Sequence, residues 1–220
     1  MIPLLLSLIA LIAYIFGGIN SSVFISNKIF QKDVRRYGSH NASFANFIQV
    51  FGQKWGAAVI LIDVVKTAIP CFIGMLLMKI PGSGFGTLGV LFAGFCTVLG
   101  DCYPWRFRFK GNFGVVSCLT ALWIADWRVG LLSSAVYGIV LAFTRLNSLA
   151  GMLLAFSGSL FSWCFVSAEN CKGLCGLLAL FSAVVIIFRQ REALLRILNG
   201  RESRVHWGKK AEDLLKEDRF

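Results

Sequence analysis

The sequence predicts an all-α protein, a polytopic membrane helix bundle of about seven transmembrane spans. Two observations support this prediction. Of the 220 residues, 57% are hydrophobic and only 15% are charged, which is more apolar surface than a water-soluble domain of this size can bury. The apolar residues also fall into separate runs divided by basic or turn-forming segments. Runs of about 20 apolar residues are long enough to cross the hydrocarbon core as helices.

The spans are placed by dividing the chain wherever charged or turn residues interrupt an apolar run. The first run has no basic segment before it and no small-residue cleavage site, so we interpret it as a retained helix and not as a signal peptide. The fourth and fifth spans are short, so this pair of helices is open to crossing less than the full thickness of the bilayer. The seven predicted spans cover roughly residues 2–26, 55–78, 86–104, 112–125, 127–143, 147–166 and 173–188.

Lysine and arginine are distributed very unevenly between the two sides of this arrangement. With the N-terminus outside, the outer loops hold only Lys79, Arg128 and Lys172, while Lys66 lies within a span. All other basic residues lie in the inner loops and the tail, which predicts an outer N-terminus and a cytoplasmic C-terminus. Because this asymmetry explains most of the net charge of +11, we expect membrane lipid and not nucleic acid as the partner.

We expect one membrane domain over residues 1–204, followed by a polar cytoplasmic tail over residues 205–220. Residues 189–200 place Leu194, Leu195 and Leu198 against basic residues, which is typical of an amphipathic helix on the inner leaflet. The sequence leaves the oligomeric state open.

Seven cysteines occur, mostly within apolar runs. Cys171 and Cys175 flank a predicted outer turn, and their spacing leaves a disulfide open. The chain has no CxxC pair and no histidine cluster, so we expect no metal site.

Three polar stretches are predicted to meet at the inner face. Residues 33–46 combine Arg35 and Arg36 with a glycine and with small hydroxyl and amide residues, a composition that suits either a phosphate site or a connecting loop. Asp63 and Lys66 lie within a span, three residues apart on one helical face. They can neutralise each other, either as functional groups or as a structural ion pair near the inner interface.

The third stretch, residues 100–117, alternates Arg106, Arg108 and Lys110 with phenylalanines and has glycines just before an apolar helix begins. Cations, free amides and a helix N-terminus together bind anions. The alternative is an ordinary basic loop that anchors the protein at the membrane surface.

In their order along the chain these stretches resemble motifs of the bacterial acyl-phosphate glycerol-3-phosphate acyltransferases of the PlsY type. Members carry DxRxxGSGNxGxTN, DxxKG, GHxxPxFxxFKGGKGVAT, TRYxSL and HRxNxxRLxxGxE, in this order. The matching positions here are Asp33, Arg35, Gly38, Ser39, Asn41 and Asn46, then Asp63 and Lys66, then Gly100, Pro104, Phe109, Lys110, Gly111, Gly114 and Val115, then Thr144, Arg145, Ser148 and Leu149, and finally Arg191, Arg196, Gly200 and Glu202.

The resemblance implies acyl transfer from acyl phosphate to the sn-1 hydroxyl of glycerol 3-phosphate, which gives lysophosphatidic acid for phospholipid synthesis. It implies a site facing the cytoplasm of the bacterial plasma membrane, with no cofactor and no covalent intermediate. Catalytic roles fall on Ser39, Asn41, Lys110 and Arg191, and binding of the substrate phosphates falls on Arg35, Gly38, Asn46, Lys110, Gly111, Gly114, Arg145, Ser148 and Arg196.

Several motif positions are substituted: His40, Ser43 and Asn112 replace glycines, Ala45 replaces a threonine, Asp101 and Gln190 replace histidines, Phe113 replaces a lysine and Ala193 replaces an asparagine. Asp101 would place a negative charge near two anionic substrates, unless it caps a helix or pairs with Arg106. Loss of one transition-state donor typically costs about 10²–10³ in rate. The substitutions therefore keep a second hypothesis open, a catalytically degenerate paralogue that binds lipid, acyl phosphate or a partner protein without turnover. A small transporter is a third, disfavoured because the charges within the spans are few.

Overall fold

The computed structural model describes residues 2–38, 42–81, 83–107, 109, 111–166 and 171–199, without the side chains of Ala45, Gln53 and Ser83. Over these residues the chain is helical and contains no strand, so the predicted all-α fold is confirmed. The predicted tail, residues 205–220, lies outside the described residues. The α-helices are α1 (Ile2–Gly17), α2 (Ser21–Ile29), α3 (Phe44–Phe51), α4 (Gln53–Lys79), α5 (Gly86–Cys102), α6 (Val115–Ala125), α7 (Trp127–Thr144), α8 (Asn147–Phe165), α9 (Lys172–Arg189) and α10 (Arg191–Leu198), and the short 3-10 helices are η1 (Val34–Arg36), η2 (Ser83–Phe85) and η3 (Trp105–Phe107).

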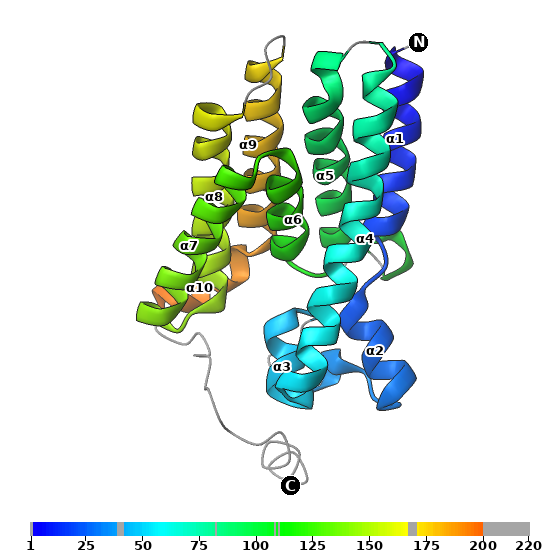
Figure 1. The fold of residues 1–220 in the computed structure, drawn as a ribbon. Coiled ribbons are helices and arrows are strands. Elements are labelled where there is room, and N and C mark those ends of the chain that lie inside the picture. Colours follow the sequence, from blue (N-terminus) through cyan, green and yellow to red (C-terminus); the bar gives the residue numbers. More distant parts are fainter. Residues whose placement is uncertain are drawn as a thin grey trace, which may run out of the picture.

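In the described part of the chain, 6 helical stretches are long and apolar enough to cross a membrane: Ile2–Ile29, Lys54–Lys79, Gly86–Phe107, Trp127–Thr144, Asn147–Phe165 and Lys172–Arg189. Helix α6 has only 11 residues, which rise about 17 Å against a hydrocarbon core of about 30 Å. The prediction that the fourth span is short is therefore confirmed. The same prediction for the fifth span is wrong, because α7 has 18 residues and is long and apolar enough to cross a membrane. The α6–α7 turn accordingly lies below the upper ends of α1, α4 and α5 (Figure 1).

The predicted first span, residues 2–26, is divided into α1 and α2. Gly17 ends α1 against α5, at a point where a Cβ atom would collide with the carbonyl of Thr97. Asn20 then caps α2, because its side-chain oxygen accepts a hydrogen bond from the amide of Val23 at 3.1 Å. The break lets α2 turn away from the axis of α1 at the lower end of the bundle (Figure 1).

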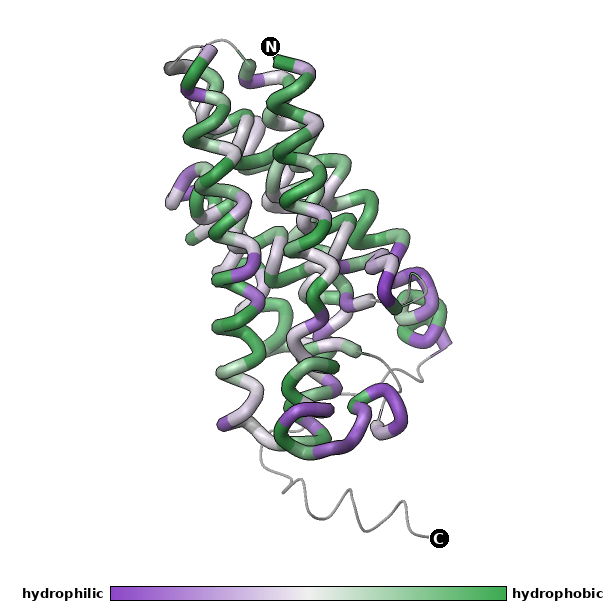
Figure 2. The backbone as a smooth tube through the Cα atoms, turned by 90° about the vertical axis from the view of Figure 1, so that its right-hand side faces the viewer, coloured by the Kyte–Doolittle hydropathy of each residue, from purple (hydrophilic) through white to green (hydrophobic). Residues whose placement is uncertain are grey.

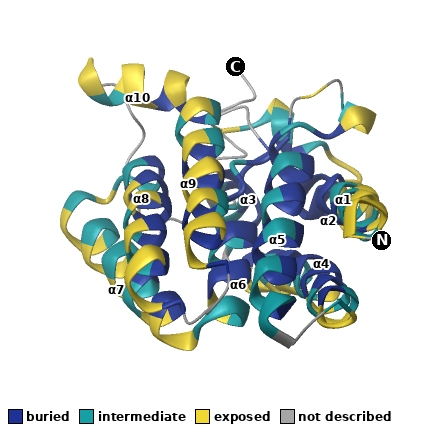
Figure 3. Ribbon diagram, turned by 90° about the horizontal axis from the view of Figure 1, so that it is seen from above, coloured by how far each residue is buried: buried dark blue, intermediate teal, exposed yellow. Residues whose placement is uncertain are grey.

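Helix α5 forms the centre of the bundle and is buried over most of its length (Figure 3). Small residues allow the helix backbones to approach: Gly74 of α4 and Gly89 of α5 each lie against the other's carbonyl, where a side chain would not fit. The outer surface carries large apolar side chains, such as Leu4 and Phe143. Small residues between the helices and large apolar side chains on the outer surface are typical of a helix bundle that is surrounded by lipid.

Hydrophilic residues gather at the end of the bundle where α2, α3 and α10 lie (Figure 2). Helix α10 is amphipathic, with Leu195 and Leu198 exposed and Ala193 buried, so the predicted amphipathic helix is confirmed over Arg191–Leu198. Cys171 and Cys175 are both free, so the disulfide that their spacing left open does not form.

Candidate functional site

The ammonium group of Lys66 is the centre of a buried ion cluster. Its Nζ atom lies 2.7 Å from Asp63 Oδ1 and 2.9 Å from Asp101 Oδ1, and it donates a hydrogen bond to the carbonyl of Ile19 at 2.9 Å. These three acceptors match the three hydrogens of the ammonium group. The predicted pair of Asp63 and Lys66 is confirmed, and all three charged side chains are at most 4% exposed.

Asp101 lies in the last turn of α5, and its Oδ2 atom accepts a hydrogen bond from Ser117 of α6 at 3.1 Å. The expectation that Asp101 caps a helix or pairs with Arg106 is therefore wrong, because its carboxylate is buried between α4, α5 and α6. The carboxylate of Asp101 is paired with Lys66, which it shares with Asp63, so the cluster of two carboxylates and one ammonium group keeps one net negative charge. At the motif's histidine position the chain thus carries a residue that links three helices.

The loop between α5 and α6, residues 103–114, is called here the basic loop. Its two ends are joined by backbone hydrogen bonds from Gly111 to Cys102 (3.2 Å) and from Asn112 to Asp101 (2.9 Å). Arg189, at the end of α9, donates to the carbonyls of Cys102 (3.2 Å) and Gly111 (2.8 Å). A side chain at Gly111 would collide with the carbonyl of Asp101, so the closure requires glycine there.

Sequence analysis missed the role of Arg189, which it counted only among the inner basic residues. Its guanidinium carbon also lies 6.0 Å from the ring centroid of Phe113, the residue at the motif's lysine position. The position of Arg189 in the last turn of a span was the one available signal, and it carries no information about a partner far away in the sequence.

The first polar stretch folds into a turn around η1. Arg35 binds the carboxylate of Asp33 through its side chain, with a shortest distance of 2.7 Å, and this guanidinium lowers the pKa of that carboxyl below its usual value. Arg35 also lies over the ring of Phe107, 5.4 Å from its centroid, so the turn contacts the basic loop. Gly38 has a φ of +61°, a conformation that favours glycine.

Asn46 holds this turn from α3. Its side-chain nitrogen donates to the carbonyls of Val34 and Tyr37, both at 3.1 Å. These two bonds occupy both amide hydrogens, so Asn46 shapes the turn that was predicted to contact phosphate. Ser39, His40, Asn41 and Lys110, which include most of the predicted catalytic residues, lie outside the described residues.

The remaining predicted residues lie around the α7–α8 turn and α10. Arg145 ends α7 with a φ of +57° and is followed by Ser148, which is buried in the first turn of α8. Arg191 lies over the ring of Phe188 at 5.1 Å, and Arg196 lies in the last turn of α10. These residues share the hydrophilic end of the bundle with α2 and α3 (Figure 1).

The two substituted positions of the last motif are both buried. Gln190 is 1% exposed, between α9 and α10, and its two polar side-chain atoms have no partner among the described residues. Its Nε2 atom points towards Gly151 of α8. Ala193 is 2% exposed, and neither residue lines the cavity described next.

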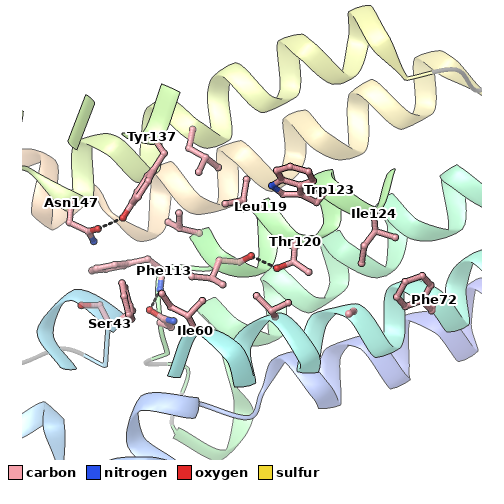
Figure 4. Close-up of a pocket in the computed structure, with 17 residues that line it drawn as sticks. Ser43, Ile60, Phe72, Phe113, Leu119, Thr120, Trp123, Ile124, Tyr137 and Asn147 are labelled. Atoms are coloured by element: carbon pink, nitrogen blue, oxygen red, sulfur yellow. Dashed lines mark hydrogen bonds between the residues drawn. The ribbon is translucent and has the colours of Figure 1, made fainter. Parts of the chain in front are cut away.

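A cavity of about 440 Å³ connects these stretches. At one end it is bordered by Ser43 from the first stretch, by Asn112 and Phe113 from the basic loop and by Asn147 at the start of α8. Figure 4 shows Tyr137 at the same end, where its hydroxyl donates to Asn147 Oδ1 at 2.6 Å. Two of the three predicted polar stretches, residues 33–46 and 100–117, therefore meet the start of α8 at one end of one cavity, whereas Asp63 and Lys66 do not line it. Sequence analysis missed Tyr137, which lies within an apolar run.

The other end of the cavity is apolar. It extends between α4 and α6 to Phe72, Trp123 and Ile124, away from the polar end (Figure 4). A ligand with a polar head and a hydrocarbon tail matches this arrangement.

Two helices begin at the polar end of the cavity without a side-chain cap. Gly114 precedes α6 with a φ of +73°, and Leu146 precedes α8; neither makes a side-chain capping bond. The first residues of these helices, Val115 and Asn147, both line the cavity. Uncapped helix N-termini present amide hydrogens and a positive partial charge, so this end favours an anion.

The sequence profile of the glycerol-3-phosphate acyltransferase family matches residues 7–200. A glycerol-3-phosphate acyltransferase of Finegoldia magna is 28% identical over 92% of this chain and 97% of its own length, and one of Clostridioides difficile is 30% identical over 93% and 97%. The chain is also similar to the crystal structure of PlsY, an integral membrane glycerol 3-phosphate acyltransferase, in its glycerol 3-phosphate form. The two structures superpose with a TM-score of 0.78 and 30% sequence identity, over 96% of this chain and 98% of PlsY. A lysophosphatidic acid form of PlsY is also similar, with a TM-score of 0.75. The likeness spans all the helices that line the cavity, and the chain is a multi-pass membrane protein.

Proposed function

We propose that this chain, which belongs to the glycerol-3-phosphate acyltransferase family, transfers an acyl group from acyl phosphate to the sn-1 hydroxyl of glycerol 3-phosphate. The product is lysophosphatidic acid, which enters phospholipid synthesis. The solved PlsY structures in glycerol 3-phosphate and lysophosphatidic acid forms support the acceptor and the product. Acyl phosphate as the donor is our own further step.

The observation that carries this proposal is the polarity of the cavity along its length. An acyl phosphate has an anionic head and a hydrocarbon chain, and the cavity has an anion-favouring end and an apolar end. The head would lie between Ser43, Asn112 and Asn147, beside the start of α6 and α8. The chain would extend between α4 and α6.

In the proposed reaction the sn-1 hydroxyl attacks the carbonyl carbon of acyl phosphate. An ester bond forms, the bond between the carbonyl carbon and the phosphate oxygen breaks, and the departing phosphate takes up the proton of the hydroxyl and leaves as inorganic phosphate. Direct attack requires neither a cofactor nor a covalent enzyme intermediate. Negative charge grows on the carbonyl oxygen and on the departing phosphate, and cations and amides at the polar end would stabilise it.

We assign the phosphate contacts to three sources around the polar end. In this proposal Arg35 and Gly38 would act from the first stretch, whose turn Asn46 holds. Lys110, Gly111 and Gly114 would act from the basic loop, and Arg145, Ser148 and Arg196 from α7, α8 and α10. Ser39, Asn41, Lys110 and Arg191 are the proposed catalytic residues.

A specific observation favours the second hypothesis, a paralogue without turnover. Phe113 lines the cavity where the family motif has a lysine, so the chain lacks one cation at the polar end. Such a protein would keep the cavity and bind lipid, acyl phosphate or a partner protein.

The deciding experiment uses the purified protein in detergent with palmitoyl phosphate and labelled glycerol 3-phosphate. Lysophosphatidate formed above the level of mock-purified membranes supports turnover. Product at the blank level, together with measurable binding of palmitoyl phosphate, supports the paralogue without turnover.

We further propose that the chain lies in the bacterial plasma membrane with an outer N-terminus and a site that faces the cytoplasm. The concentration of basic residues at the end that carries α2, α3 and α10 supports this orientation. A C-terminal green fluorescent protein fusion is expected to fluoresce, and a C-terminal alkaline phosphatase fusion to be inactive. The reverse pattern contradicts the orientation.

A further inference from the structure

One face of α4 forms a long wall of the cavity. Ile60, Val64, Ala68 and Phe72 recur every four residues along α4, and all four line the cavity. From Ile60 to Phe72 the helix rises about 18 Å. The hydrocarbon of one membrane leaflet is about 15 Å deep, half of the bilayer core, so the wall is about as long as the chain of a membrane lipid.

The facing wall is α6, which contributes Val116, Leu119 and Thr120 to the cavity. Thr120 does not present a free hydroxyl hydrogen, because the hydroxyl donates to the carbonyl of Val116 at 2.8 Å. The space between α4 and α6 is therefore called here the apolar arm, and it suits a hydrocarbon chain along its whole length.

The far end of the apolar arm is bordered by side chains that are held in place. Trp123 donates from its indole nitrogen to Ser134 of α7 at 3.0 Å. Its ring also lies against Gly130, where an added Cβ would be 2.5 Å from the ring. Phe72 of α4 lies farther from the polar end than Trp123, on the side of Ile124 (Figure 4). Trp123 is 43% exposed, and its contacts with Gly130 and Ser134 of α7 hold the indole in place at this boundary of the cavity.

We infer that Ala68, Phe72 and Trp123 determine the length of the acyl chain that this protein accepts. The inference rests on the proposed function, because it takes the occupant of the arm to be the linear chain of acyl phosphate. With the phosphate at the polar end, the chain passes Val64 and Ala68 and ends at Phe72 and Trp123. Ala68 is the smallest side chain of the α4 wall, and it leaves the passage open about two thirds of the way from Ile60 to Phe72.

The test compares lauroyl, myristoyl, palmitoyl, stearoyl and arachidoyl phosphate as donors. In Ala68→Phe a ring blocks the arm before its far end, and kcat/KM for palmitoyl phosphate is expected to fall relative to lauroyl phosphate, by about fourfold for each methylene that is no longer buried. In the double variant Phe72→Ala, Trp123→Ala the arm is longer, and stearoyl and arachidoyl phosphate are expected to gain relative to palmitoyl phosphate.

The matched control is Phe181→Ala on α9. Phe181 is 53% exposed, close to the 49% of Phe72, and it does not line the cavity. Its variant is expected to keep the wild-type order of donors.

The preference for chain length is also measured without turnover. For each variant, dissociation constants are determined for lysophosphatidates that carry the same five acyl chains, in micelles of one detergent. If the wild type uses no donor, the proposed function fails, while the binding series still tests the apolar arm. If Ala68→Phe and the double variant keep the wild-type chain-length order in both measurements, the inference is overturned. An unchanged chain-length order is also what we expect if the arm is filled by bilayer lipid without selection for chain length. Should Ala68→Phe fail to fold, Ala68→Met repeats the test with a smaller side chain.

Discussion

Replacing Lys66 with methionine removes the only counter-charge that the described residues supply to Asp63 and Asp101. Both carboxylates are 1% exposed, so water cannot take over the role of the ammonium group. Breaking a buried ion pair by removing one partner costs about 3–5 kcal/mol. For a chain of this size 1 kcal/mol corresponds to about 2–4 °C in melting temperature. The Tm of Lys66→Met is therefore expected to fall by about 6–20 °C.

Asp101→Asn is the matched comparison, because two carboxylates share one ammonium group. Removing the charge of Asp101 leaves the pair of Asp63 and Lys66 intact and electrically balanced, so the expected change is within about 1 kcal/mol. Tm is measured by thermal unfolding of each variant in the same detergent. A triple variant, Lys66→Met with Asp63→Asn and Asp101→Asn, is expected to regain much of the loss, since no buried charge remains. Equal losses in Lys66→Met and Asp101→Asn would refute this charge argument.

Four further predictions concern the polar end of the cavity and the elements that hold it. Arg189→Met removes the bonds that join the ends of the basic loop, and KM for glycerol 3-phosphate is expected to rise about tenfold in the acyl-transfer assay; an unchanged KM contradicts the bracing role. Phe113→Lys adds a cation to the cavity and is expected to tighten the Kd for glycerol 3-phosphate about tenfold by calorimetry, whereas an unchanged Kd places the phosphate elsewhere. Gly111→Ala forces a side chain against the Asp101 carbonyl and is expected to lower Tm, while Gly138→Ala, where an added Cβ meets open space, is expected to leave Tm unchanged or raise it. Because Arg35 lowers the pKa of Asp33, their ion pair stabilises the fold above the usual carboxyl pKa of 3.8 and loses this effect as the pH falls through the lowered value. The Tm of Asp33→Asn is therefore expected to lie below that of the wild type at neutral pH and to equal it at the acid end. A Tm difference that does not change with pH would contradict this.

The helical fold and the Asp63–Lys66 pair were predictable because they depend on local information. Apolar runs of membrane length specify helices, and a spacing of three residues places both charges on one helical face. The short fourth span followed from the same counting. The break between α1 and α2 did not, because it depends on the contact of Gly17 with Thr97 of α5, a residue far away in the sequence.

The partner of Asp101 and the roles of Arg189 and Tyr137 were not predictable for a related reason. Each contact joins helices that are distant in the chain: Asp101 and Lys66 are 35 residues apart, and Arg189 and Cys102 are 87 residues apart. A motif shows which residue types are present, but the packing of α4, α5, α6 and α9 decides where each side chain points. The cavity likewise exists only once α4 and α6 face each other.

The substituted motif positions fall into two groups that have different consequences. Asp101, Gln190 and Ala193 are at most 2% exposed, and none of them lines the cavity. Asn112 and Phe113 do line it. Restoring a histidine at Asp101 would therefore disturb the packing around Lys66 without placing a new group at the polar end, whereas a change at Phe113 acts directly on the charge that an anionic ligand meets. Among these described positions, the loss of the lysine at Phe113 is consequently the substitution on which turnover depends most, and Phe113→Lys in the acyl-transfer assay is expected to raise kcat/KM where Asp101→His does not.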